Sequence, residues 1–116
     1  MAATDTIESN PQAYSDMMEN ARAATELLKA LSNETRLMIL CMLADGERSV
    51  SEMETMLDMR QPTVSQQLAR LRADRLVATR RDGKTIYYKL ASTDAKVIID
   101  SLHQVFCAKN CSAEVV

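Results

Sequence analysis

The sequence predicts a mainly α-helical chain that carries one two-stranded β-hairpin, and three observations support this fold class. Apolar residues recur at helical spacing before residue 45 and again after residue 92. Between these stretches, residues 49–73 have the pattern of two short helices joined by a turn. Residues 76–90 follow with the pattern of a basic hairpin. Helix, turn, helix and hairpin in this order make a winged helix-turn-helix, a unit that places its second helix in the major groove of DNA.

A single domain is expected, because 116 residues match the usual size of one folded unit. Residues 1–12 are polar, and we expect a flexible N-terminal tail there. Residues 13–110 then form the winged helix-turn-helix domain for DNA binding and dimerisation. A first helix is predicted from about 14 to 31, where Met, Ala and Leu recur at helical spacing.

A second helix is predicted from about Glu34 to Ala44. It contains the segment LMILCML, in which seven consecutive residues are apolar. A helix that is apolar on every side is either buried in the core or shared with a partner subunit. Asp45 and Gly46 end it.

The third and fourth helices both carry start signals. Ser49 and Glu52 have the spacing of a capping box, which begins a helix that extends to about Leu57. Pro62 fits the first turn of the fourth helix, because its missing N–H is not needed there. The fourth helix has apolar residues at i, i+4 and i+7, which face the core: Val64, Leu68 and Leu71.

The other side of the fourth helix is polar and is predicted to read DNA. Amide side chains there can pair with adenine, and an arginine can pair with guanine or a phosphate. A hydroxyl near the helix N-terminus suits a phosphate. The hairpin turns at Arg81-Asp82-Gly83-Lys84 with Asp-Gly at its centre, and basic side chains at its tip reach phosphates beside a minor groove. The predicted DNA contacts are Thr63, Ser65, Gln66, Gln67 and Arg70 on the helix, and Arg81 and Lys84 on the hairpin.

A fifth helix is predicted from about Thr93 to Lys109, with an apolar stripe through Ile98, Leu102 and Val105. Most helix-turn-helix proteins bind two half-sites as dimers. We therefore expect a homodimer in which the first and last helices form the subunit interface.

Charge is distributed unevenly along the chain. The formal net charge is −2, yet residues 60–89 hold eight basic and two acidic residues and so carry +6, which leaves −8 for the remainder. A basic patch on an acidic body attracts a polyanion and orients it. No apolar run approaches the roughly 20 residues that span a bilayer, and the N-terminus lacks the features of a signal peptide. We expect a soluble cytoplasmic protein that has double-stranded DNA, and no membrane, as its partner.

Four segments together resemble the ArsR/SmtB family of bacterial winged-helix repressors: LSNETRLMILCML, SVSEMETML, QPTVSQQLARLRADRLV and RRDGKTIYYKL. The resemblance covers about residues 30–90. It implies a homodimeric repressor that binds an inverted repeat near a promoter and loses DNA affinity when an inducer acts. The matching DNA-reading positions are Thr63, Ser65, Gln66 and Gln67, and many relatives have histidine where Gln67 stands.

The resemblance also bears on the inducer. The ArsR-type cysteine cluster falls on the helix before the DNA-reading helix, and here that segment is SEMETML, without cysteine. The SmtB-type zinc site uses several histidines and acids of the last helix, and here only His103 is present. Cys41 and Cys107 resemble the paired cysteines of the persulfide-sensing SqrR/BigR branch. This likeness implies a redox-sensing pair that reactive sulfur species join by a disulfide or longer sulfur bridge.

The residues themselves leave alternatives open. Cys41 lies in an apolar run, where a cysteine is ordinarily a small buried side chain. Cys107 has His103 four residues before it and Cys111 four after it, and a thiol beside an imidazole can be nucleophilic. A metal or metalloid sensor using Cys107 and Cys111 with His103 or Cys41 is the alternative, since soft ions prefer thiolates. Another thiol oxidation signal is also possible. No CxxC, glycine-rich loop or carboxylate pair is present, so we expect neither an enzyme nor a cofactor.

Overall fold

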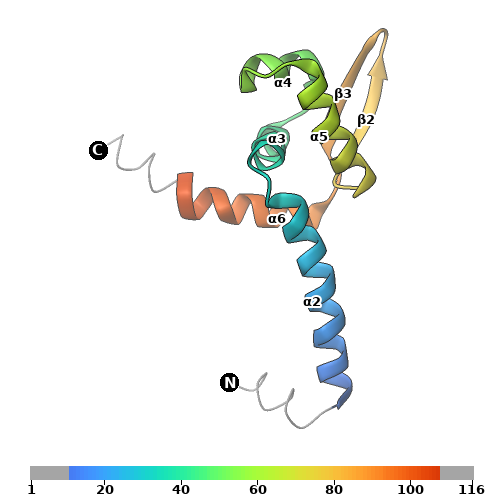
Figure 1. Ribbon diagram of the computed structural model, residues 1–116, viewed down its shortest axis with the longest axis vertical. Helices are drawn as coiled ribbons and strands as arrows, with labels where there is room; N and C mark the ends of the chain where they lie inside the picture. The colour runs from blue at the N-terminus through green and yellow to red at the C-terminus, as the bar shows by residue number, and fades with distance from the viewer. Residues whose placement is uncertain (1–10, 108–116) are drawn as a thin grey trace, which may run out of the picture.

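The computed structural model describes residues 11–107, and its elements follow the predicted order with one strand added (Figure 1). In chain order they are α2 (Pro11–Leu31), α3 (Glu34–Asp45), β1 (Arg48–Ser49), α4 (Val50–Leu57), α5 (Gln61–Ala73), β2 (Val77–Asp82), β3 (Thr85–Leu90), α6 (Thr93–Leu102) and the π-helical turn η1 (His103–Cys107). Helix–turn–helix (α4 and α5) and hairpin (β2 and β3) form a winged helix-turn-helix, which confirms the predicted fold class. Within the described residues, none of the helices is both long and apolar enough to traverse a lipid bilayer.

The core lies where α3, α4, α5 and α6 meet the base of the hairpin. The three apolar positions predicted on α5 are confirmed, because Val64, Leu68 and Leu71 are fully buried. Ile39 of α3 and Ile99 of α6 pack into the same cluster. Full burial of such side chains stabilises the fold by about 1.5–3 kcal/mol each. This core fixes α5 so that its remaining faces point outward.

The predicted capping box at the start of α4 is present. The Ser49 backbone N–H donates to Glu52 Oε1 at 2.9 Å, and the Glu52 N–H donates to Ser49 Oγ at 3.2 Å. These hydrogen bonds lower the pKa of Glu52. At the other end of α4, Asp58 adopts the left-handed conformation with φ of 54°, which stops the helix before α5 begins.

The sheet departs from the prediction in two ways. It has three strands in the order β1-β3-β2 rather than two, because Arg48 and Ser49 pair with Tyr88 and Tyr87 of β3. The hairpin turn is also displaced by one residue. The last pair of the hairpin joins Asp82 to Thr85, so Gly83 and Lys84 form the centre of the turn instead of Asp82 and Gly83.

Gly83 explains this displacement. Its φ is +64°, a value that glycine adopts without steric cost. Among the described non-glycine residues, only Asp58 and Arg75 have positive φ, so Lys84 has negative φ. A positive φ at the first central position alone is the type II′ pattern, which suits the right-handed twist of a hairpin.

α2 forms an arm that extends away from the rest of the chain (Figure 1). It begins at Pro11, inside the range assigned to the flexible tail, and residues 1–10 lie outside the described part. Only Ala30 and Leu31 of this helix are buried. The apolar stripe predicted on it is therefore present but is exposed in the single chain, as Leu28 at 57% illustrates.

Two other helices differ from expectation. The apolar α3 is buried on one side only: Ile39, Leu40 and Leu43 are buried, but Met38 and Cys41 are exposed on its remaining face, and the alternative that this face is shared with a partner subunit stays a prediction. The last helix is not regular over its described part, since α6 ends at Leu102 and continues as the π-helical η1 to Cys107, and its predicted end at Lys109 lies outside the described residues. A π turn widens the helix locally and is frequent at functional sites.

Candidate nucleic-acid interface and thiol pocket

α5 presents the polar face that the sequence predicts for DNA reading. Thr63, Gln66 and Arg70 are exposed, whereas Ser65 and Gln67 are half-buried. Pro62 lies in the first turn, and Arg60 at the N-cap makes no side-chain hydrogen bond that would close the helix end. The N–H groups of this first turn give the helix N-terminus a positive potential. The face thus combines amides, hydroxyls and a helix N-terminus, the groups that contact bases and phosphates.

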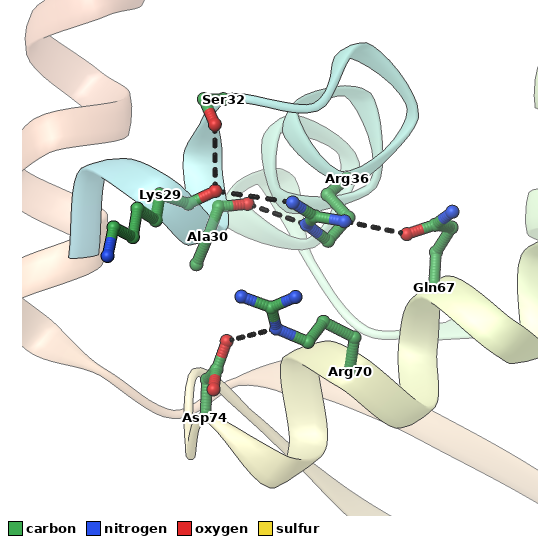
Figure 2. Close-up of polar contacts among 7 residues, drawn as sticks. All are labelled: Lys29, Ala30, Ser32, Arg36, Gln67, Arg70 and Asp74. Carbon is green, nitrogen blue, oxygen red and sulfur yellow. Dashed lines mark hydrogen bonds and ion pairs between the residues drawn. The ribbon is translucent and has the colours of Figure 1, made fainter. Parts of the chain in front are cut away.

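Gln67 is joined to the rest of the molecule by Arg36 of α3 (Figure 2). Arg36 Nη1 donates to Gln67 Oε1 at 3.0 Å, across 31 residues of sequence. The same guanidinium donates through Nε to the Ala30 carbonyl at 2.8 Å and through Nη2 to the Lys29 carbonyl at 3.2 Å. Sequence reasoning missed Arg36. The available signal was a single cation in the first turn of the helix, directly before its long apolar run.

Arg70 is engaged within its own helix. Its Nε donates to Asp74 Oδ2 at 2.9 Å, and both side chains are partly exposed (Figure 2). An exposed i,i+4 pair of this kind contributes only about 0.3–0.5 kcal/mol. A phosphate can therefore compete with Asp74 for Arg70.

The wing carries its predicted basic tip and one anchored arginine. Arg81 and Lys84 are exposed near the turn between β2 and β3. Arg80 instead reaches Glu47 in the loop before β1, with Nε 2.8 Å from Oε2 and Nη2 2.9 Å from Oε1. Its guanidinium also lies over the Tyr87 ring, 4.7 Å from the centroid. Hydrogen bonding to Arg80 lowers the pKa of Glu47, and the reciprocal contact raises the pKa of Arg80.

Cys41 lies on the other side of α3, where that helix and α6 border an open cavity of about 560 Å³. The interpretation of Cys41 as a buried core residue is wrong, because its side chain is exposed and lines this cavity. His103 lines the same cavity from the start of η1, so two residues far apart in sequence are brought to one site. Arg48 and Lys96 border it as well, and the Nε of Arg48 is buried without a hydrogen-bond partner.

Cys107 is the last described residue, four positions after His103 at the end of η1. The structure describes the backbone of Cys107 but not its side chain. Cys111 lies outside the described residues. Within residues 11–107, no group of three His, Cys, Asp or Glu side chains is placed to hold a metal ion. Of the alternative metal ligands His103, Cys107 and Cys111, only His103 therefore has a described side chain.

Comparison with known proteins agrees with this geometry. The family described as bacterial regulatory protein, arsR family, matches residues 33–79, from the N-cap of α3 into β2. The transcriptional activator HlyU of Vibrio cholerae is 46% identical over 100 residues, which cover 86% of this chain and 93% of the relative. A biofilm growth-associated repressor of Agrobacterium fabrum is 49% identical over 92 residues, covering 79% of each chain.

The fold of the solved relatives is also shared. The structure of reduced HlyU from Vibrio cholerae is 48% identical and superposes with a TM-score of 0.77, covering 79% of this chain and 97% of that chain. The similar proteins are transcriptional regulators by name rather than enzymes. With near-complete coverage of relatives at this identity, the chain belongs to the arsR family of bacterial transcriptional regulators.

Proposed function

We propose that this regulator is a dithiol redox-responsive repressor. It binds operator DNA while Cys41 and Cys107 are reduced, and it releases the DNA when reactive sulfur species bridge them. One observation carries the proposal: the exposed Cys41 borders an open cavity together with His103, one turn before Cys107 on the same helical segment. A structural relative solved in a form described as reduced supports a thiol-based input.

The chemistry uses a low-molecular-weight persulfide, RS–SH, as the oxidant. The Cys41 thiolate attacks the outer sulfur, the S–S bond of the donor breaks, and RS⁻ leaves and takes up a proton, so Cys41 becomes Cys–S–SH. The Cys107 thiolate then attacks the inner sulfur of this group and displaces HS⁻, which leaves a disulfide. If both cysteines carry an extra sulfur, attack of one persulfide on the other releases one HS⁻ and leaves a trisulfide.

The number of sulfur atoms in the bridge determines which oxidants can join the two cysteines. A disulfide requires Cα atoms about 4.4–6.8 Å apart. A bridge with one or more additional sulfurs spans a longer gap. A cysteine pair held beyond disulfide distance therefore responds to persulfide donors and resists peroxide.

The DNA-reading helix α5 packs against α3 as well, away from the cavity that Cys41 lines. α3 packs against α5 as well as α6, so a covalent link from Cys41 to the C-terminal segment constrains the helix that supports the DNA-reading face. Because each half of a palindromic site must meet one recognition helix, a small change in orientation weakens both contacts at once. A coupling free energy of about 1–3 kcal/mol is sufficient for regulation.

DNA binding to an inverted repeat requires two subunits, and we propose a homodimer formed by α2 with α6 and η1. Large apolar side chains are exposed on these elements in the single chain. They are Tyr14, Met17, Met18 and Leu28 on α2, and Val97, Val105 and Phe106 on α6 and η1. Large apolar side chains that gather on exposed helices are typical of surfaces that associate with another protein.

Treatment of the reduced protein with glutathione persulfide tests the proposal. Mass spectrometry of the non-reduced product distinguishes a disulfide, a polysulfide and a bound metal. DNA affinity is measured in parallel, using duplexes that the reduced protein selects from a random pool. We expect a Cys41–Cys107 cross-linked peptide and loss of DNA binding. Both effects should disappear in Cys41→Ser and Cys107→Ser and persist in the control Cys111→Ser.

Two results oppose the proposal. A persulfide-treated protein that contains no Cys41–Cys107 cross-link rejects the bridge. Release of DNA by arsenite or cadmium, but not by persulfide, assigns the protein to the metal-sensing alternative built on Cys107 and Cys111 with His103 or Cys41.

A further inference from the structure

Arg36 occupies the junction of three helices. Its guanidinium donates three hydrogen bonds through Nε, Nη1 and Nη2, which reach the end of α2 and the middle of α5 (Figure 2). Two of the acceptors are carbonyls in the last turn of α2, which carry the negative end of that helix dipole. The guanidinium is thus held from the α2 side independently of Gln67. Its fork geometry keeps Nη1 aimed at α5.

This arrangement determines which half of the Gln67 carboxamide is engaged. A guanidinium has only donors, so the atom of Gln67 that faces it must be the acceptor Oε1. The Nε2 amino group points away from Arg36 (Figure 2). Gln67 itself is half-buried and lies between the exposed Thr63 and Arg70 on the same face of α5.

We infer that Arg36 is a positioning residue that makes Gln67 a hydrogen-bond donor toward DNA. The inference rests on the proposed DNA-reading role of α5. A carboxamide recognises adenine through both of its halves, accepting from N6 and donating to N7. Because Oε1 is turned toward Arg36 and Nε2 away from it, Nε2 is the half of the carboxamide left to face DNA, and the acceptors available to it are N7 or O6 of guanine, N7 of adenine, O4 of thymine and phosphate oxygens. Arg36 therefore restricts the base preference of a position that it does not itself touch.

Because the same guanidinium binds the Lys29 and Ala30 carbonyls, this restriction depends on the end of the α2 arm. Movement of α2 relative to α3 displaces Arg36 and frees Oε1 of Gln67. The orientation of the arm and the base preference of α5 are then linked through one side chain.

A double-mutant cycle tests the inference. Affinity for a duplex selected by the unmodified protein is measured by fluorescence anisotropy for Arg36→Leu, Gln67→Ala and the double variant. We expect Arg36→Leu to weaken binding about tenfold when Gln67 is present, and less than about twofold in the Gln67→Ala background, since coupled residues are not additive. The control is a second cycle that combines Arg36→Leu with Gln66→Ala, at the exposed neighbouring glutamine. In that cycle the losses of binding free energy from the two single variants should add.

A second readout separates positioning from stability. Duplex selection is repeated with Arg36→Lys, which keeps the charge but cannot hold both the carbonyls and Gln67 in a planar fork. We expect preference for adenine to increase at one position of each half-site. Equal losses from Arg36→Leu in both backgrounds, together with an unchanged base preference for Arg36→Lys, would reduce Arg36 to a structural role. Failure of the unmodified protein to enrich any duplex would reject the proposed function instead.

Discussion

Arg80 of the wing and Glu47 of the loop before β1 are joined by three hydrogen bonds, from Nε to Oε2 at 2.8 Å, from Nη2 to Oε1 at 2.9 Å and from Nε to Oε1 at 3.0 Å. The two residues are 33 positions apart in sequence. This bidentate pair holds β2 against the segment that leads into the helix-turn-helix. It gives the wing a fixed attachment partway along β2, while Arg81 and Lys84 remain available near the tip.

The attachment predicts a distinctive titration. Arg80 lowers the pKa of Glu47 from its ordinary 4.5, so Glu47 should protonate only below that value. The signal of the Arg80 Nε–H in ¹H–¹⁵N spectra should therefore change with a midpoint under 4.5. Glu47→Gln should abolish this transition. A midpoint at or above 4.5 would show that the pair does not form in solution.

The lowered pKa values of two glutamates also predict how stability changes in acid. Glu47 and Glu52 both have a lowered pKa in the folded state, so their stabilisation is present above about 4.5 and is lost as pH falls through the folded values. Melting temperature should drop over that interval. The double variant Glu47→Gln with Glu52→Gln should show a shallower drop, because neither glutamine titrates. Identical slopes for the variant and the unmodified protein would contradict the assignment.

The capping box offers a local test of stability. Ser49→Ala removes the acceptor for the Glu52 N–H and should cost about 1 kcal/mol. In a domain of this size that corresponds to roughly 4–8 °C in melting temperature. Ser51→Ala, two positions later at an exposed site of the same helix, is the control and should change little. Comparable losses at both positions would argue against a specific cap.

Local patterns allowed correct prediction of local structure. The Ser49–Glu52 spacing and the Val64, Leu68, Leu71 stripe each depend on a few neighbouring residues, and the structure confirms both. Contacts between distant segments were not predictable in the same way. The bond from Arg36 to Gln67 depends on how α3 crosses α5, and nothing in either segment alone encodes that crossing.

The remaining differences have similar causes. A strand of two residues, Arg48–Ser49, is too short to show an alternating pattern, so β1 was missed. The exposure of Cys41 depends on which face of the apolar α3 meets its neighbours, and a helix that is apolar all round contains no signal for that choice. The roles of Cys41 and Cys107 remain a prediction.

The apolar surface of α2 predicts the oligomeric state. Leu28 is 57% exposed, so Leu28→Glu should cost a single chain little stability. If α2 lies in a dimer interface, the same substitution buries a charge and should shift the protein to monomers at micromolar concentration. Light scattering after size-exclusion chromatography measures the shift. The control is Arg22→Glu, an exposed polar position on the same helix, and a protein that is monomeric before any substitution would reject the interface.

His103 provides a test of the thiol pocket. It lines the same cavity as Cys41, and an imidazole near a thiol favours the thiolate. In a background of Cys107→Ser and Cys111→Ser, Cys41 alone reports, and its reaction with glutathione persulfide is followed between pH 6 and 9. His103→Gln should slow the reaction about tenfold at pH 7, because an imidazole neighbour favours the reactive thiolate, and the difference should vanish at high pH. Gln104→Ala, the adjacent exposed residue that does not line the cavity, should react like the parent. Superimposable pH profiles for His103→Gln and the parent would remove His103 from the chemistry of this site.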